Sequence, residues 1–295
     1  MIQTFSDPTS ASKWCSEQRA RGRKLGFVPT MGALHEGHLE LVRRATKEND
    51  AVCVSIFVNP LQFDEKSDFE RYPRDFEGDA RMLAEAGAAM AFTGTLAGFF
   101  TRGLGPDGKL DPHLLEKPGV AAQGLEGALR PGHFAGVATI VRRLFECVLP
   151  ARAYFGQKDF QQTLVVRELA KKLGAPPIVV CPTARESDGL ARSSRNVFLK
   201  PDERAQAVAI PRALEAAAAR WQAGERKPAE LARVLRAALD RAPFTLQYAT
   251  VRDPERWTPD EPKAPLERAV ALVALRLGAV RLIDNRALHT QDGSL

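Results

Sequence analysis

Continuous apolar runs in the first sixty residues predict strands that are buried on both faces. Leu25–Val28 ends at Pro29, and Ala51–Phe57 is rich in β-branched residues. Uninterrupted runs of this kind are typical of parallel sheets that are covered on both sides. Between them, Leu39–Glu48 has apolar side chains at nearly helical spacing, with charged side chains at the other positions. The pattern therefore predicts a β-α-β unit.

The same alternation of helix and strand continues to about residue 181. We expect a first helix that opens at Asp7 or Thr9, and further helices and strands after the unit above. The helices are Asp75–Ala86, Gly136–Leu149 and Phe160–Leu173, and the strands are Ala88–Thr93, Ala153–Phe155 and Pro177–Cys181. Residues 94–132 contain many glycines and prolines and few periodic apolar positions, so we expect a long irregular region there.

The pattern changes after Pro201. Two alanine-rich helices, at about Asp202–Gln222 and Pro228–Leu239, precede three expected strands. These strands are Leu246–Val251, Ala269–Leu277 and Ala279–Ile283, with a turn at Gly278. An α+β unit that follows an α/β unit implies a second domain. We therefore expect residues 1–185 and 186–295 to form separate domains.

The composition is that of a globular protein and narrows the function only a little. The chain has 295 residues, of which 44% are apolar, and a net charge of +6 that favours anionic ligands without naming them. The four cysteines are scattered singly, so we expect buried free thiols in a reducing compartment. No apolar stretch approaches the roughly 20 residues of a membrane span, and the first residues lack a signal-peptide pattern. We therefore expect a soluble cytoplasmic protein.

The stretch KLGFVPTMGALHEGH is the strongest candidate for chemistry. His35 and His38 lie three residues apart at the predicted start of a helix, with Gly32 and Gly37 close by. The first N–H groups of a helix have no partner within it, and the helix dipole favours negative charge, so this position suits a phosphate. Two imidazoles could add hydrogen-bond donors. The pattern H-x-G-H is typical of the ATP site of nucleotidyltransferases and class I synthetases.

The two histidines could also bind zinc or play a purely structural role. A zinc pair on a helix usually has histidines four residues apart with a glutamate at the second position, whereas HEGH has them three apart. Histidines that cap the helix or face solvent would fit the spacing as well. The remaining turns of the chain must decide between these roles.

Polar side chains also follow the second predicted strand and the irregular region. Asn59 and Gln62 stand just after the strand, and ligands of open α/β sheets collect at the carboxyl ends of strands. Gln62 can both donate and accept hydrogen bonds, as a hydroxy acid would require. Arg130 or His133, where the irregular region ends, could reach an anion.

Two later segments offer further anion-binding turns. Gly156–Asp159 (GQKD) repeats the order of strand, glycine turn and helix start, and its lysine can neutralise phosphate charge. Ser193–Arg195 supplies two hydroxyls and a fork-shaped cation, which suit the oxygens of a triphosphate. Together with HEGH, these segments favour a nucleotide.

These segments resemble the pantothenate synthetase (pantoate–β-alanine ligase) family. The matching motifs, in the family's order, are PTMGALHEGH, VSIFVNPLQF, RPGHFAGVATIV, YFGQKDFQQ, DGLARSSRN and LVALRLGAVRLIDN. The resemblance implies a ligase that uses ATP and Mg²⁺ to join pantoate to β-alanine through a pantoyl-adenylate intermediate, releasing AMP and pyrophosphate. It also implies the α/β fold class, with a Rossmann-like, HIGH-type nucleotidyltransferase parallel sheet and a smaller C-terminal α+β domain that covers the site, in a homodimer.

The resemblance assigns roles to individual residues. His38 matches the proton donor, and we expect His35, Lys158 and Arg195 to act beside it. Gln62 and Gln162 match the residues that hold pantoate, and Arg130 is a further candidate for substrate binding. The residues expected to contact ATP are Met31, Gly32, Ala33, Leu34, His35, Glu36, Gly37, His38, Gly156, Gln157, Lys158, Asp159, Ala184, Arg192, Ser193, Ser194 and Arg195.

Two features depart from the family. Arg192 stands where the family usually has Met or Leu, and residues 94–123 match poorly, so no role is assigned to that loop. Asp79 is a candidate Mg²⁺ ligand.

Two alternatives to the ligase belong to different functional classes. One is a related adenylyltransferase that acts on another small acid or a nucleotide. The other is a non-enzymatic RNA-binding module, but only 7% of the residues are aromatic and they do not interleave with basic residues in the way that stacks bases. We expect neither a nucleic-acid partner nor a membrane.

Overall fold

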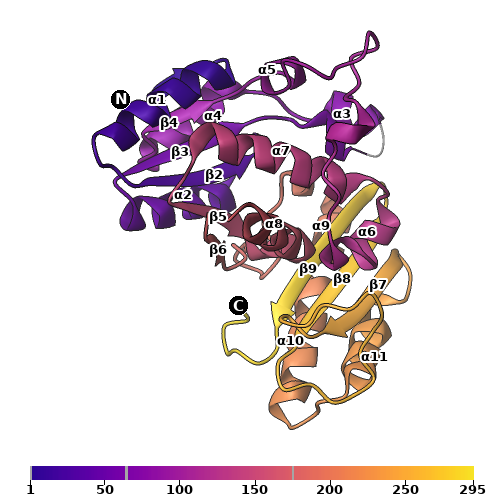
Figure 1. Ribbon diagram of the computed structural model, residues 1–295. Helices are drawn as coiled ribbons and strands as arrows, with labels where there is room; N and C mark the ends of the chain where they lie inside the picture. Colours follow the sequence, from indigo (N-terminus) through magenta and orange to yellow (C-terminus); the bar gives the residue numbers. More distant parts are fainter. Residues whose placement is uncertain (1, 64–65, 175) are drawn as a thin grey trace. The chain divides into compact units, whose positions relative to one another are not determined.

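The computed structural model describes residues 2–63, 66–174 and 176–295, and the chain forms two compact units. The first unit contains the chain up to Ala122, Glu126–Phe155 and Gln161–Val180, and the second contains Gln123–Leu125, Gly156–Phe160 and Cys181–Leu295. The strands are β1 (Gln3–Phe5), β2 (Leu25–Thr30), β3 (Ala51–Ile56), β4 (Met90–Phe92), β5 (Arg152–Gly156), β6 (Ile178–Cys181), β7 (Phe244–Arg252), β8 (Val270–Leu277) and β9 (Val280–Ala287). The helices are α1 (Pro8–Ala20), α2 (Glu36–Glu48), α3 (Lys66–Arg71), α4 (Phe76–Glu85), α5 (Leu96–Phe99), α6 (Leu125–Leu129), α7 (His133–Val148), α8 (Phe160–Leu173), α9 (Pro201–Ala207), α10 (Ala209–Gln222) and α11 (Pro228–Leu239) (Figure 1).

The first unit is built on a six-stranded sheet with the strand order β1-β4-β3-β2-β5-β6. β2 pairs in parallel with β3 on one side and with β5 on the other. The chain therefore builds outward from β2 through β3 and β4, and later resumes on the opposite side of β2 with β5. Such a reversal is a topological switch point, where ligands of open α/β sheets bind outside the carboxyl ends of the strands. The HEGH stretch follows β2, and the GQKD turn follows β5.

Helices cover both faces of this sheet. Phe27 and Cys53 are fully buried in a cluster that also contains side chains of α1, α7 and α8. Val28 and Val54, the next residues along these two strands, point to the opposite face, where α2 and α4 contact β3. The central strands are thus buried on both sides, as their continuous apolar sequences predict.

The second unit has an antiparallel sheet of three strands, in the order β7-β8-β9. α10 and α11 pack against each other, and α11 packs on β7. Leu231, Leu235 and Leu239, four residues apart along α11, are fully buried in this core. The predicted fold class, an α/β unit with a smaller C-terminal α+β unit, is confirmed.

The end of β2 differs from the prediction for a clear reason. The strand continues through Pro29 to Thr30 instead of ending at Val28. A proline has no N–H to donate, so it is tolerated in a strand only where no ladder hydrogen bond is needed. β5 pairs with β2 only at Gly26 and Phe27, which leaves the proline position unpaired on that side.

Other element boundaries also differ. The expected helix Asp202–Gln222 is interrupted between α9 and α10, since Pro211 would lack its hydrogen bond and clash within a continuous helix. β9 runs beyond Ile283 to Ala287, because Asp284 and Asn285 are buried within the strand. The sequence pattern does not predict β1, a three-residue strand that pairs with β4.

Residues 94–132 contain only short regular elements, as expected. They include α5, α6 and two short 3₁₀ turns, and an isolated antiparallel bridge joins Leu104 to Leu110. The backbone reverses between these residues, with the Gly105 N–H donating to the Lys109 carbonyl at 2.8 Å.

Candidate functional site

A buried carboxylate holds the turn that follows β2. The Asp79 oxygens accept hydrogen bonds from the N–H groups of Ala33 (3.0 Å) and Leu34 (2.9 Å). The turn needs this support because Gly32 and Ala33 both have positive φ, at 83° and 50°. A side chain at position 32 would come within 2.9 Å of an Asp79 oxygen, so the glycine permits the close approach.

The environment of Asp79 shifts its titration. Burial raises the pKa of the Asp79 carboxyl above its ordinary value, and the N–H groups of Leu34 and Ala33 oppose part of the rise. Within the described part of the chain, no group of three or more His, Cys, Asp or Glu side chains could hold a metal ion. The contacts of this carboxylate are therefore those of a residue that supports a turn.

His35 and His38 bind the backbone at the start of α2. Nδ1 of His38 accepts from the His35 N–H at 3.3 Å, and Nδ1 of His35 accepts from the Gly37 N–H at 3.2 Å. A neutral imidazole that accepts at Nδ1 carries its hydrogen on Nε2. Each ring therefore caps the helix with one nitrogen and has a donor on the other. The sequence leaves helix capping and anion binding as alternative roles for the two histidines, and the structure allows both roles at once.

Gln62 is held in a network at the end of β3. Its Nε2 donates to the Met31 sulfur at 3.0 Å, and its Oε1 accepts from Asn59 Nδ2 at 3.0 Å. Asn59 is almost completely buried and also donates to the Gly136 carbonyl at 3.1 Å. The side chain of Gln62 is thus joined to the Met31 turn and to α7.

Arg130 and His133 hold the backbone of Gln62. Arg130 Nη2 donates to the Gln62 carbonyl at 3.2 Å, and His133 Nδ1 lies 2.9 Å from the same oxygen. Gly136 lets α7 approach this loop, because a Cβ there would lie 2.0 Å from the Leu61 carbonyl oxygen. Arg130 and His133, which are predicted to bind an anion, therefore also position Gln62, which is predicted to bind the substrate. Gln162, the other residue predicted to bind pantoate, is half-buried on α8 of the same unit.

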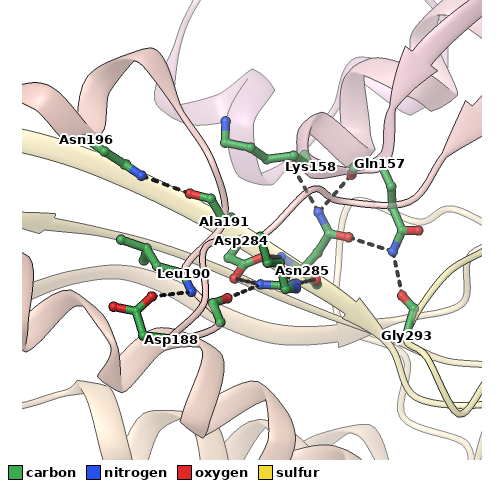
Figure 2. Close-up of polar contacts among 11 residues, drawn as sticks. Gln157, Lys158, Asp188, Leu190, Ala191, Asn196, Asp284, Asn285 and Gly293 are labelled. Carbon is green, nitrogen blue, oxygen red and sulfur yellow. Dashed lines mark hydrogen bonds and ion pairs between the residues drawn. The ribbon is translucent and has the colours of Figure 1, made fainter. Parts of the chain in front are cut away.

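The GQKD turn belongs to the second unit, where its backbone is fixed by β9. Asn285 Nδ2 donates to the carbonyls of Gln157 and Lys158, at 2.9 Å each (Figure 2). The Gln157 side chain is buried and donates to Asn285 Oδ1 (3.1 Å) and the Gly293 carbonyl (2.8 Å). Gln157 is therefore engaged through its side chain, whereas Lys158 points away from Asn285 and lies 3.8 Å from the Asp159 carboxylate.

The segment 184–192 forms a small hairpin in the second unit. Arg185 and Ala191 are bridged, and the Arg192 N–H donates to the Ala184 carbonyl at 2.9 Å. The Arg192 guanidinium turns back along this hairpin, where Nε donates to the Arg185 carbonyl at 3.4 Å. Next to it, the Ser193 hydroxyl accepts from the Arg195 N–H and caps the short 3₁₀ helix η5 (Ser194–Phe198).

The candidate residues thus fall into two groups. The first unit contains Met31, Gly32, Ala33, Leu34, His35, Glu36, Gly37, His38, Gln62, Asp79, Arg130 and Gln162. The second contains Gly156, Gln157, Lys158, Asp159, Ala184, Arg192, Ser193, Ser194 and Arg195. Within the first group, hydrogen bonds link the Met31 turn to Asp79 and Gln62; within the second, they link Gln157 and Lys158 to β9.

Comparison with known proteins places the chain in a family. The model of the pantoate–β-alanine ligase family matches residues 3–287. The chain belongs to this family. The pantothenate synthetase of Rubrobacter xylanophilus is 48% identical over 277 residues, which cover 92% of this chain and 93% of that protein. That of Chloroflexus aggregans is 47% identical over 269 residues, which cover 90% and 94%.

Solved structures of the ligase family agree with this assignment. The pantothenate synthetase of Thermus thermophilus is 42% identical and superposes with a TM-score of 0.85, covering 98% of this chain and 100% of that one. The ligase of Francisella tularensis, solved with β,γ-ATP and β-alanine, is 32% identical with a TM-score of 0.76, covering 99% and 100%.

Sequence reasoning missed the residues that support the turns of this family member. Asn285, Asp284 and Arg185 make the hydrogen bonds that fix the second group, and the sequence suggests only a metal-ligand role for Asp79. The available signal was the motif LIDN, in which two polar residues directly follow the apolar pair Leu282 and Ile283. No helix within residues 2–63, 66–174 and 176–295 is long and apolar enough to cross a bilayer.

The raised pKa of Asp79 predicts a pH dependence of stability. A carboxyl whose pKa rises on folding stabilises the fold fully below its ordinary value of 3.8, and this contribution is lost as the pH rises through the raised value. The free energy of unfolding of the native protein minus that of Asp79→Asn should therefore fall as the pH rises from 3.8 through the raised pKa. Urea denaturation of both proteins across this range measures it. A difference that grows with pH would mean that folding lowers this pKa.

Proposed function

We propose that this protein joins pantoate to β-alanine with the use of ATP, giving pantothenate, AMP and pyrophosphate. The observation that carries the proposal is the family match over residues 3–287, with relatives close to half identical over nine-tenths of their length. The relative from Francisella tularensis was solved with β,γ-ATP and β-alanine.

The reaction has two steps. The pantoate carboxylate attacks the α-phosphorus of ATP, the bond to pyrophosphate breaks, and pantoyl adenylate forms. The amine of β-alanine then attacks the acyl carbon, and AMP leaves with its phosphate. Charge builds on phosphoryl oxygens in the first step, so positioned hydrogen-bond donors and cations lower its barrier.

In the first unit, the residues at the start of α2 supply such donors. We propose that the Nε2–H groups of His35 and His38 contact phosphate oxygens, and that His38 is the proton donor. Met31–Leu34, Glu36 and Gly37 shape the ATP contact around them, with Asp79 holding the turn. Each histidine has its orientation fixed by a backbone hydrogen bond to Nδ1, which reduces the reorganisation needed when charge develops.

Pantoate is assigned to the glutamines of the same unit. Gln62 lies at the carboxyl end of β3, and Asn59 and Met31 hold its side chain. We propose that Gln62 and Gln162 bind pantoate. Because Arg130 donates to the Gln62 carbonyl, we propose that it acts on substrate binding at least partly through this residue.

In the second unit, we propose that Gly156–Asp159, Ala184 and Arg192–Arg195 contact ATP. Lys158 and Arg195 supply positive charge, and Ser193 and Ser194 supply hydroxyls. Because the Gln157 side chain is buried and bonded within the unit, its contact with ATP is assigned to the backbone. Arg192 stands where the family usually has Met or Leu. Because its guanidinium donates to the Arg185 carbonyl, the backbone of the hairpin remains able to contact ATP.

Mg²⁺ is proposed as part of the ATP substrate. Both Asp79 oxygens accept from backbone N–H groups, and the described residues include no cluster of three or more metal-ligating side chains. Mg²⁺ commonly keeps several waters and binds substrate phosphates rather than a cage of protein ligands. We therefore propose that the phosphates of ATP and waters hold the Mg²⁺, and that Asp79 supports the turn after β2.

Three further features follow from family membership as proposals. The enzyme works in the cytoplasm, which suits its four buried cysteine thiols. It acts as a homodimer, with neither a nucleic acid nor a membrane as partner. Residues 1–185 and 186–295 are the proposed domains.

The direct test is an assay with ATP, Mg²⁺, pantoate and β-alanine. AMP and pantothenate should form one for one, and omission of β-alanine should stop pantothenate formation. A related adenylyltransferase would instead turn over another acid or nucleotide without consuming both of these substrates. Absence of AMP across salt and metal conditions would contradict the ligase.

The hydrogen-bonding pattern of His38 predicts different effects of two amide variants. His38→Asn keeps an acceptor near the Nδ1 position but loses the donor at the ring tip, whereas the amide nitrogen of His38→Gln reaches toward that tip. His38→Asn should lower kcat by about 100-fold, and His38→Gln should lower it less.

A matched control is His289→Asn. The Nδ1 atom of His289 also contacts backbone, lying 3.1 Å from the Ala269 carbonyl oxygen, but no role in the reaction is assigned to this histidine. Its kcat should stay near that of the native enzyme. If His38→Asn turned over as fast as the control, His38 would not be the proton donor.

A further inference from the structure

Two consecutive polar residues on β9 are almost completely buried. Asp284 and Asn285 are 3% and 2% exposed. Neighbouring side chains on a strand point to opposite faces, so each of them needs its own set of hydrogen-bond partners. Asn285 has its partners in the GQKD turn (Figure 2), and Asp284 has its partner in Arg185 of the neighbouring hairpin.

Asn285 has all of its amide groups engaged with the GQKD turn. Its nitrogen donates to the carbonyls of Gln157 and Lys158, and its oxygen accepts from Gln157 Nε2. These two carbonyls are consecutive, so a single amide fixes the peptide plane on either side of Lys158. An aspartate has no donor for them, and an alanine would leave them without this partner.

Asp284 fixes the neighbouring hairpin through Arg185. Its two carboxylate oxygens accept from Arg185 at 2.8 and 3.1 Å. The same guanidinium donates to the carbonyls of Gly189 (2.9 Å) and Asn285 (3.2 Å). Arg185 therefore ties the 184–192 hairpin to the strand at the point where Asn285 holds the GQKD turn.

We propose that Asn285 is a positioning residue for ATP, which aims Lys158 by fixing the carbonyls on either side of it, while the adjacent Asp284 fixes the 184–192 hairpin through Arg185. The inference rests on the proposed function, since it takes Lys158 to contact ATP. It assigns the motif LIDN a role in the reaction beyond packing. All of the contacts that it uses lie within the second unit.

The test compares Asn285→Asp with the native enzyme. This variant keeps the shape and the acceptor but replaces both donors with a carboxylate that faces two carbonyls. We expect kcat/KM for ATP to fall by about 10- to 100-fold, with KM for pantoate and for β-alanine within about twofold. Equal losses of kcat/KM for all three substrates would indicate general damage to the enzyme and would overturn the proposal.

A double-mutant cycle with Lys158→Ala tests whether Asn285 acts through the lysine. In the Lys158→Ala background, Asn285→Asp should cost less than about threefold in kcat/KM for ATP, because the aimed group is already gone. If the two losses multiplied in full, Asn285 would not act through Lys158.

A matched control is Asn49→Asp. This asparagine donates to the Ala45 carbonyl and the Tyr154 hydroxyl, and its replacement should leave kcat/KM for ATP within about twofold.

Failure of this inference can be told apart from failure of the proposed function. If the native protein forms no AMP with pantothenate, the function is wrong; if it does and Asn285→Asp has native kcat/KM for ATP, only the role of Asn285 is wrong. Should Asn285→Asp fail to fold, Asn285→Ser replaces it, since its hydroxyl retains one donor. That variant should show a smaller loss confined to ATP, and native kinetics with Asn285→Ser would overturn the proposal.

Discussion

Buried side chains that satisfy backbone groups fix the turns of this protein, and the rest of the candidate site depends on that constraint. A turn that presents hydrogen-bond donors or cations to a ligand lies outside regular secondary structure, so its other backbone groups need side-chain partners. Asp79 therefore accepts from two N–H groups after β2, and Asn285 donates to two carbonyls after β5. The half-buried Arg185 and Arg130 likewise bind backbone carbonyls, of the hairpin and of Gln62.

This arrangement suits a reaction in which no covalent bond to the protein is required. Adenylate formation needs donors and cations that are already in place when charge develops, and supporting contacts supply that preorganisation. The histidines combine two roles, because the nitrogen that caps α2 also determines which nitrogen carries the hydrogen. The need for supporting contacts also explains why Gln157 is buried, while the side chain of Lys158, the next residue, points away from Asn285.

The sequence predicts the strands and helices that have a regular pattern, and fails where tertiary contacts override it. β3 and α8 follow directly from apolar runs and helical periodicity. The continuation of β2 through Pro29 depends on how far β5 pairs, which no local pattern contains. The pattern ends β9 too early because Asp284 and Asn285 look like the end of a strand until their buried partners are known.

The residues of the candidate site also differ in whether the sequence alone can predict them. Residues that would touch a ligand stand in short motifs with glycine turns, so HEGH, GQKD and SSR can be found from the sequence. Residues that hold those motifs lie 45 to 128 positions away, as Asp79 does from Leu34 and Asn285 from Gln157. Their contacts require the fold, and the metal role expected for Asp79 follows only from the family resemblance.

Amide hydrogen exchange in the unliganded protein tests most directly whether buried side chains fix these turns. The N–H groups of Ala33 and Leu34 should exchange at least about 100-fold more slowly than that of Lys109, whose partner Asp107 is exposed to solvent. Protection of both would show that the carboxylate of Asp79 holds the turn before any ligand arrives. Exchange of Ala33 and Leu34 as fast as Lys109 would contradict the account.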